Sequence, residues 1–533
     1  MLILQNITYQ HSNKDLLFSN INLAINSKEK IALIGNNGSG KSTLLKLING
    51  DLKPISGQIK AEVKPCYIPQ IFGQFDDFTI AEALKVNVKL KALQAILEGN
   101  TNEENFNDLA DDWTIEERCK EALSQWQLAD LTLSQKLSTL SGGQKTKVFL
   151  AGIEVHKPRF ILMDEPSNHL DVASRKLLYE FVQSDTATLL LVSHDKKLLN
   201  LLDKVCELNS AGITVYGGNY DFYEEQKEIE LNALNHDLKS RERALKNAKE
   251  KEREATERQQ KLDAKGKKKQ EKAGVSRIMM NTLRNKAENS TAKLKGVHTD
   301  KINGIAQELQ QLRSNIPDID KMKFGFEDTD LHIGKTLFEA VNINFAYSNQ
   351  HLWKNDLDFL IKSGERILLK GSNGSGKTTL IRIILGKLQV SKGTLKRQDL
   401  KSVYIDQDYS LINNDLNVYD QAQQFNDGAL QEHEIKIRLN RFLFTKETWD
   451  KPCRNLSGGE KMRLSLCCLT ISQKSPDLIV LDEPTNNLDI QNIDIMVTAI
   501  NNYHGTLIVV SHDEHFLSEI NIGREVVCEA KVN

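Results

Sequence analysis

Two copies of a glycine-rich phosphate-binding pattern constrain this chain more than any other feature. The copies, each with the threonine that follows, are Gly35, Asn36, Asn37, Gly38, Ser39, Gly40, Lys41, Ser42 and Thr43 in the first half, and Gly371, Ser372, Asn373, Gly374, Ser375, Gly376, Lys377, Thr378 and Thr379 in the second half. Glycines in this pattern let backbone N–H groups converge on phosphate oxygens at the start of a helix. We predict that each lysine reaches the β- and γ-phosphates of a nucleotide and that the hydroxyl after it binds Mg²⁺.

Each phosphate loop is followed by the same four motifs in the same order. They are a glutamine after a strand, a Ser-Gly-Gly turn at a helix start, an apolar strand ending in Asp-Glu, and a second apolar strand ending in histidine. Their residues are Gln70, Ser141, Gly142, Gly143, Gln144, Asp164, Glu165 and His194 in the first half, and Gln407, Ser457, Gly458, Gly459, Glu460, Asp482, Glu483 and His512 in the second. We predict that the aspartate and the glutamine complete a Mg²⁺ site with the loop hydroxyl. The catalytic glutamate would polarise a water, and the histidine would sense the γ-phosphate.

Each motif taken alone has a simpler explanation. A histidine after a strand is usually structural, and Asp-Glu-Pro is a common exit from a strand. A phosphate loop alone indicates a nucleotide but not what the nucleotide drives. The repetition of all five features in one order argues against these separate explanations and indicates an internal repeat.

The spacing of the repeat locates an insertion. The two loop lysines are 336 residues apart, whereas Asp164 and Asp482 are 318 apart, as are the two histidines. The first half therefore carries about 20 extra residues between its glutamine and its Ser-Gly-Gly turn. We place them at about 86–115, where Val86 to Leu93 has a helical sequence and Gly99 to Asn102 that of a turn.

Basic charge is concentrated between the two halves. Residues 236–300 hold 19 Lys or Arg and 10 Asp or Glu, a net charge of +9, while the whole chain has −2. Such a concentration favours a polyanionic partner, and the simpler alternative is a solvated helical linker. The lysine-rich run Lys267, Lys268 and Lys269 suits phosphate groups and cannot read a base sequence.

The segment between the halves is predicted to form a helical hairpin. Residues from Asn232 to about Leu262 contain good helix formers and almost no breakers. A helix from Ala287 to about Asn315 can return antiparallel, with a tip at about 263–286. An apolar seam of coiled-coil type would join the two helices, formed by Leu231, Leu234, Leu238 and Leu245 with Ile302, Ile305, Leu309 and Leu312.

Composition limits the class of protein further. Among 533 residues there is no apolar run of the roughly 18–20 residues that span a bilayer. The chain starts without the basic and apolar regions of a signal peptide. Seven scattered cysteines without a CxxC pair favour reduced thiols in the cytoplasm over disulfides or zinc.

Together these motifs resemble the nucleotide-binding domains of ATP-binding cassette proteins, and the linker and the insertion resemble the ABC-F family. The Tyr216–Tyr223 stretch, Tyr-Gly-Gly-Asn-Tyr-Asp-Phe-Tyr, is similar to the one that closes the first cassette in that family. The resemblance implies an α/β fold of two P-loop cassette domains in tandem, joined by a long α-helical hairpin linker. The first cassette would span 1–225 with its short arm at 86–115, the linker 226–322, and the second cassette 323–533.

The resemblance also implies how ATP and Mg²⁺ would bind. In a head-to-tail sandwich, site one joins the first phosphate loop to Ser457 and Gly459, and site two joins the second loop to Ser141 and Gly143. The adenine-stacking residue is implied to be His11 in one site and Tyr347 in the other, with Tyr9 a nearby candidate. Because both Asp-Glu pairs are intact, we expect two competent sites, although the change from Tyr to His could make them unequal in affinity.

The family resemblance implies a cytoplasmic, monomeric ATPase that binds the ribosome, with its linker near the tRNA exit site and the peptidyl-tRNA. It would modulate translation or protect the ribosome from antibiotics. An alternative is the ATPase subunit of a transporter whose membrane domain is a separate chain, but a basic helical linker has no role there. DNA-repair ATPases of cassette type carry much longer coiled coils or zinc modules, and this chain has neither.

Overall fold

The computed structural model describes residues 1–10, 16–70, 72–100, 102–209, 212–272, 296, 299–312, 332, 334–347, 350–372, 374–486 and 488–529. The chain divides into two compact units. One unit contains both halves of the repeat, Met1–Asp221 with Met322–Asn533, and the other is Phe222–Lys321.

The first half contains two sheets, and each takes strands from before and after the first phosphate loop. An antiparallel sheet has the order β2-β1-β4, and a six-stranded sheet the order β5-β6-β7-β3-β8-β9, parallel except at its β8-β9 edge. The strands are β1 (Leu2–Gln10), β2 (Leu16–Ile25), β3 (Lys30–Ile34), β4 (Ser56–Ala61), β5 (Cys66–Ile68), β6 (Phe160–Asp164), β7 (Thr188–Val192), β8 (Lys204–Asn209) and β9 (Gly212–Tyr216). The apolar runs β6 and β7 are buried along their whole length, as parallel strands covered on both faces require.

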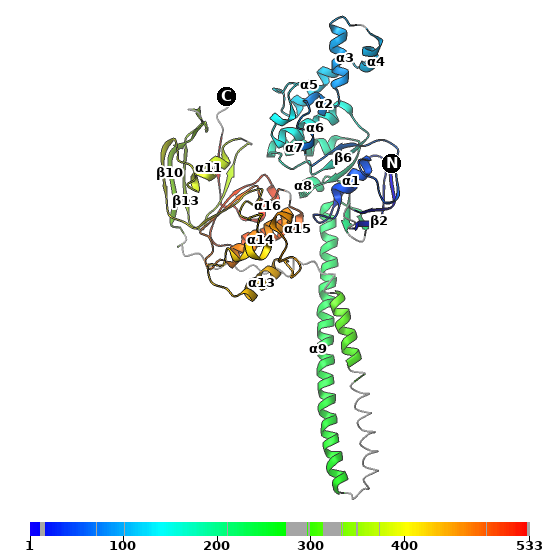
Figure 1. The fold of residues 1–533 in the computed structure, drawn as a ribbon, viewed down its shortest axis with the longest axis vertical. Helices are drawn as coiled ribbons and strands as arrows, with labels where there is room; N and C mark the ends of the chain where they lie inside the picture. The colour runs from blue at the N-terminus through cyan, green and yellow to red at the C-terminus, as the bar shows by residue number, and fades with distance from the viewer. Residues whose placement is uncertain are drawn as a thin grey trace. The chain divides into compact units, whose positions relative to one another are not determined.

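Helices follow the strands in the order that the motifs predicted. They are α1 (Lys41–Asn49), α2 (Ile80–Ala83), α3 (Asn87–Leu97), α4 (Glu103–Leu109), α5 (Ile115–Gln125), α6 (Gly142–His156), α7 (Val172–Ser184) and α8 (Lys196–Leu199). The α3 and α4 helices occupy the segment in which we placed the extra residues, and they project from the rest of the first half (Figure 1).

The second half repeats this design with fewer elements. Its antiparallel sheet is β13-β10-β15 and its parallel sheet is β16-β17-β18-β14-β19. The strands are β10 (Thr336–Asn344), β11 (Ala346–Tyr347), β12 (Gln350–His351), β13 (Leu357–Lys362), β14 (Arg366–Lys370), β15 (Lys392–Arg397), β16 (Ser402–Ile405), β17 (Leu478–Asp482), β18 (Thr506–Val510) and β19 (Arg524–Val527). The helices are α11 (Lys377–Ile384), α12 (Val418–Gln423), α13 (Glu432–Arg441), α14 (Gly458–Ile471), α15 (Ile490–Asn501) and α16 (Glu514–Glu519).

Each half has its own hydrophobic core. In the first half, residues of β1, β2, β3 and α1 pack with β6 and β7, and in the second half β10, β14, α11, β17 and β18 pack in the same way. Two separate cores confirm the predicted α/β class with two similar domains in tandem and a helical segment between them. All seven cysteines are free thiols.

The helical unit is dominated by α9 (Tyr220–Lys272), one helix of 53 residues. It begins before Asn232 and continues past Leu262, so Asp263 lies inside the helix and not in a tip. The reason is that Gly266 is the sole breaker there, and one glycine costs a helix only about 1 kcal/mol. The leucines of the predicted seam, Leu231, Leu234, Leu238 and Leu245, are half-buried.

Residues 299–312 form a second helix beside α9 (Figure 1). Leu309 on it is buried, and Arg241 of α9 lies 3.1 Å from Glu308. The predictions for His11, for Asn373 and for residues 273–286 of the tip lie outside the described part of the chain. Where the chain is described, no helix has both the length and the apolar character needed to cross a bilayer.

Candidate nucleotide sites

Both phosphate loops end at a glycine that no other residue could replace without strain. Gly40 and Gly376 cap helices α1 and α11 with positive φ angles of 97° and 89°. A Cβ atom on Gly40 would lie 2.7 Å from the Phe18 ring, and one on Gly376 would lie 2.5 Å from Leu352. Glycine is therefore required at each of these helix N-termini, where backbone N–H groups would bind phosphate.

The two loop lysines point back into their own loops. Lys41 donates from Nζ to the Gly35 carbonyl at 2.6 Å, and Lys377 donates to the Gly371 carbonyl at 2.8 Å. Burial lowers the pKa of both lysines. Among the described residues, both ammonium groups donate to neutral carbonyls, so each is well suited to a phosphate oxygen, because charge-assisted hydrogen bonds are the stronger ones.

The predicted Mg²⁺ ligands are adjacent in each half. Ser42 hydrogen-bonds to Asp164, and the Thr378 hydroxyl donates to Asp482 Oδ2 at 3.3 Å. Asp164 also accepts a hydrogen bond from Tyr67 at 3.3 Å, but its buried Oδ1 atom has no hydrogen-bond partner among the described residues. A hydroxyl beside a carboxylate with a spare oxygen fits a hard cation such as Mg²⁺, which prefers oxygen ligands.

The catalytic candidates pair in the same way in both halves. His194 Nε2 lies 3.2 Å from Glu165 Oε1, and His512 Nε2 lies 3.4 Å from Glu483 Oε1. Burial raises the pKa of Glu165 to about 8 and that of Glu483 to about 7. Burial also lowers the pKa of both histidines, so each is a neutral imidazole near pH 7. A carboxyl group tuned to about neutral pH is suited to act as a general base.

Each Ser-Gly-Gly turn starts a helix, as predicted. The Ser141 hydroxyl accepts from the Gln144 N–H, and Ser457 accepts from the Glu460 N–H, in capping boxes that begin α6 and α14. These caps fix the N-terminal amides of Gly142, Gly143, Gly458 and Gly459 at the ends of helices whose positive dipole favours an anion.

At site one, residues from both halves line a single cavity of about 420 Å³. Residues of the first half that line it include Lys41, Ser42, Gln70, Glu165 and His194. Ser457 and Gly458 of the second half line the same cavity. The structure therefore brings Ser457 to the first-half residues of site one, while Gly459, the other residue assigned from the second half, does not line this cavity.

The arrangement at site two is different. A cavity of about 780 Å³ beside the second loop is lined by Gly371, Ser372 and His512, with Asp171 to Ala173 of the first half. Ser141 and Gln407 are not among its lining residues, and Gln407 is exposed. Of the residues predicted for site two, only the loop residues Gly371 and Ser372 and the histidine His512 line this cavity, and Ser141 does not.

Tyr347, the predicted stacking residue of the second half, lies beside the second phosphate loop. Its side chain is 53% exposed beside the second loop, its hydroxyl lies 3.1 Å from Thr379 Oγ1, and its ring meets Phe345 edge-on at 4.9 Å. Tyr9 of the first half is half-buried, with its ring 6.2 Å from that of Phe18.

Sequence reasoning missed a pair of aspartates between the sites. The Asn37 N–H of the first loop donates to Asp489 Oδ2 of the second half at 2.9 Å, and Asp171 of the first half lines the cavity beside the second loop. The signal was available, because these aspartates are 318 residues apart, the same offset as the catalytic residues.

Comparison with known proteins identifies the family. The ABC transporter family model matches residues 18–168 and 354–486, more than half of the chain. The ATP-binding protein YbiT of Escherichia coli is 29% identical over 98% of this chain and 94% of its own length. The ribosome protection protein VmlR of Bacillus subtilis is 28% identical over 99% of this chain and 86% of its own length.

Solved structures support the same fold. One chain from a complex of an archaeal ribosomal stalk protein with an archaeal ribosome recycling factor matches with a TM-score of 0.59 at 19% identity, over 98% of this chain and 87% of that one. With the family matched twice along the sequence and the phosphate loops, carboxylates and capped helices in place, the chain is an ATPase that belongs to the ATP-binding cassette family and is of the ABC-F type.

Proposed function

We propose that this ATPase binds the ribosome and uses ATP to place its interdomain helices near the tRNA exit site and the peptidyl-tRNA. There it would modulate translation or protect the ribosome from antibiotics. The observation that carries the proposal is a helical unit of basic net charge inserted between the two ATP-binding halves. The similarity to VmlR, a ribosome protection protein, supports the choice of partner.

Both ATP sites would work by the same chemistry. Lys41 and Lys377 would hold the β- and γ-phosphates, and the Ser42–Asp164 and Thr378–Asp482 pairs, with Gln70 and Gln407, would hold Mg²⁺. When bound, that ion neutralises charge on the phosphates. Glu165 and Glu483 would each take a proton from the attacking water, and the neutral histidine beside each would donate toward the γ-phosphate.

ATP would act by stabilising the closed arrangement of the two halves. Ser457 and Ser141 with their helix N-termini would complete the sites only on closure, so ATP favours the closed state by differential affinity. Because both halves are on one chain, closure is intramolecular and needs no second copy. Hydrolysis would remove the γ-phosphate contacts and release the protein from its partner.

The decisive experiment traps the closed state. We expect the double variant Glu165→Gln and Glu483→Gln, given ATP, to co-sediment with ribosomes in a gradient. The same variant with ADP is the control and should stay at the top. If the variant binds ATP but does not sediment with ribosomes, the proposed partner is wrong and a transporter subunit becomes the better interpretation.

A second experiment tests the role of the basic segment. Reversal of charge at Lys267, Lys268 and Lys269 should weaken ribosome binding and reduce its dependence on salt concentration. The matched control reverses three exposed lysines of the first half, Lys60, Lys64 and Lys157, which changes the net charge equally. Equal loss in both variants would mean that total charge, and not this segment, determines binding.

A further inference from the structure

The two halves differ at a position next to the aspartates that lie between the sites. Arg175 on α7 occupies the place that Ile493 occupies on α15, since both lie four residues after Asp171 and Asp489. Four residues further along each helix, Tyr179 corresponds to Val497. A buried cation with a hydroxyl partner thus occurs in the first half where the second has aliphatic residues.

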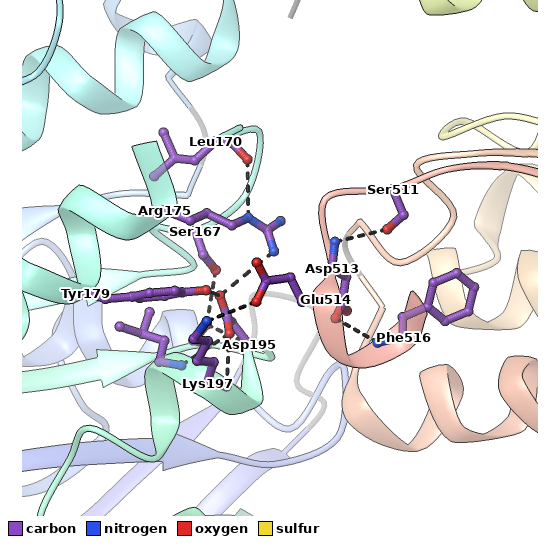
Figure 2. A network of polar contacts seen from close by, with 12 residues as sticks. Ser167, Leu170, Arg175, Tyr179, Asp195, Lys197, Ser511, Asp513, Glu514 and Phe516 are labelled. Carbon is purple, nitrogen blue, oxygen red and sulfur yellow. Dashed lines mark hydrogen bonds and ion pairs between the residues drawn. The ribbon is translucent and has the colours of Figure 1, made fainter. Parts of the chain in front are cut away.

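Arg175 contacts two loops of the first half, one at Leu170 and the other at Asp195 (Figure 2). Its Nε donates to the Leu170 carbonyl at 3.2 Å, and its guanidinium lies 3.9 Å from Asp195 Oδ2. The side chain is only 11% exposed, so water screens this charge weakly. Tyr179 donates to the same Asp195 oxygen at 2.6 Å and fixes the carboxylate.

A second contact joins the same two loops. The Ser167 and Ser193 hydroxyls lie 3.2 Å apart and are buried, and Ser193 also accepts from the Asp195 N–H at 3.1 Å. His194, the histidine predicted to sense the γ-phosphate at site one, therefore lies between Ser193, which contacts the 167–171 loop, and Asp195, which contacts Arg175 and Tyr179 of α7.

The 167–171 loop leads directly to site two. Asp171 at its end lines the cavity that Gly371, Ser372 and His512 of the second half also line. Among the charges that act on Glu483 against its burial, the positive charge of Arg175 is the largest that lowers its pKa. Lys197 and Glu514 pair at 2.9 Å in the same region, but both are largely exposed and such pairs contribute little.

Each aspartate accepts from the side chain three positions further along: Asp171 from the Ser174 hydroxyl at 2.6 Å, and Asp489 from the Asn492 amide at 2.6 Å. In the second half, Arg463 of α14 also donates to Asn492 at 3.0 Å. Ile493, in the place of Arg175, is buried and apolar. The loop that faces site one is thus fixed through α14, and the loop that faces site two through Arg175.

We propose that Arg175 is a positioning residue for site two, which holds the 167–171 loop against the switch loop 193–195 and so keeps Asp171 facing the second phosphate loop. The inference rests on both sites being competent, as the proposed function has it. The two sites would then be unequal, because the contacts that hold Asp171 at site two include the loop that carries His194 of site one.

The test compares Arg175→Ile, which installs the residue of the second half, in two backgrounds of the full chain. With Glu165→Gln, only site two turns over, and kcat should fall roughly ten-fold with little change in KM, since misplacement of a loop costs rate more than binding. With Glu483→Gln, only site one turns over, and kcat should change less than about two-fold, because Tyr179 and Ser167 still hold the 193–195 loop that carries His194. The control is Lys176→Ile, the neighbouring exposed lysine on the same helix, which should leave both rates unchanged.

Hydrogen exchange provides a readout that does not depend on turnover. Arg175→Ile should raise amide exchange across residues 167–171 and leave the second half unchanged, and Arg175→Lys, which keeps the charge, should restore part of the site-two rate. Equal losses of kcat in both backgrounds, or unchanged exchange at 167–171, would overturn the proposal. If the Glu165→Gln protein alone has no turnover, two-site competence fails, and the exchange result then decides the role of Arg175.

Discussion

The two halves of this chain are more alike in the residues of their nucleotide sites than in the residues that support those sites. The lysine, hydroxyl, aspartate, glutamate and histidine that face the nucleotide sites recur at the same places in the fold. The supporting residues differ. Lys30 and Arg366 lie at corresponding positions of β3 and β14 but have different hydrogen-bond partners. Lys30 donates to the Val182 carbonyl, whereas Arg366 donates to the carbonyls of Ile500, Tyr503 and Ile520. Residues that contact ligand are constrained by a common reaction, and residues behind them only by the packing of their own half.

The largest expected effect tests whether both halves are catalytic. Glu165→Gln with Glu483→Gln should lower ATP hydrolysis at least about 100-fold, because a general base contributes that much or more. Each single substitution should leave the turnover of the other site. The ratio of the two single-variant rates, measured by phosphate release, gives the inequality of the sites. If one single substitution abolishes all turnover, the halves are not independent in catalysis.

The next effect is on stability and compares Arg366 with Lys30, the supporting residues of the two halves. Arg366→Met removes the donor from three carbonyls near helix ends and should destabilise the second half by roughly 2–3 kcal/mol. Lys30→Met removes fewer hydrogen bonds and should destabilise the first half by about 1 kcal/mol. Hydrogen exchange in β14 and β3 under mild denaturant measures each half separately. Equal losses would mean that the extra contacts of the arginine add nothing.

A smaller effect separates the sites by pH. A general base works only when ionised, so the rate rises as pH increases through its pKa. Burial raises the pKa of Glu165 further than that of Glu483, to about 8 against about 7. The pH profile of kcat/KM, which reports the free enzyme, should therefore rise at higher pH for site one than for site two. The profiles are measured with the other site silenced, and coincident profiles would contradict the difference in burial.

The sequence predicted the strands and helix starts that carry the candidate site residues, since those residues are held in local motifs. Short apolar strands, glycine loops and capped helices are all specified within about ten residues. The insertion at 86–115 was placed by comparing the two copies, and α3 and α4 lie there. The partners of Arg175 and Arg366 could not be predicted, because their contacts join segments that only the complete fold brings together. Arg366, for example, bonds to residues more than 130 positions away.

The end of α9 was predicted too early in the sequence. The tip of the hairpin was expected to start at about residue 263, yet the helix continues to Lys272. A single glycine costs about 1 kcal/mol, which the strong helix formers on both sides of it offset.

The smallest effect we predict is on nucleotide affinity at site two. If adenine stacks on Tyr347, Tyr347→Ala should raise KM for ATP about three- to ten-fold in the Glu165→Gln background, because one aromatic contact contributes about 0.5–1.5 kcal/mol. Tyr347→Phe keeps the ring and loses only the hydroxyl contact to Thr379, so its KM should stay near that of the parent. An equal rise for both variants would assign the effect to the hydroxyl, and no rise for either would place adenine elsewhere. The same pair of substitutions at Tyr9, measured in the Glu483→Gln background, tests whether an aromatic residue of the first half stacks on adenine. A smaller rise there would extend the inequality of the two halves from their supporting residues to the nucleotide itself.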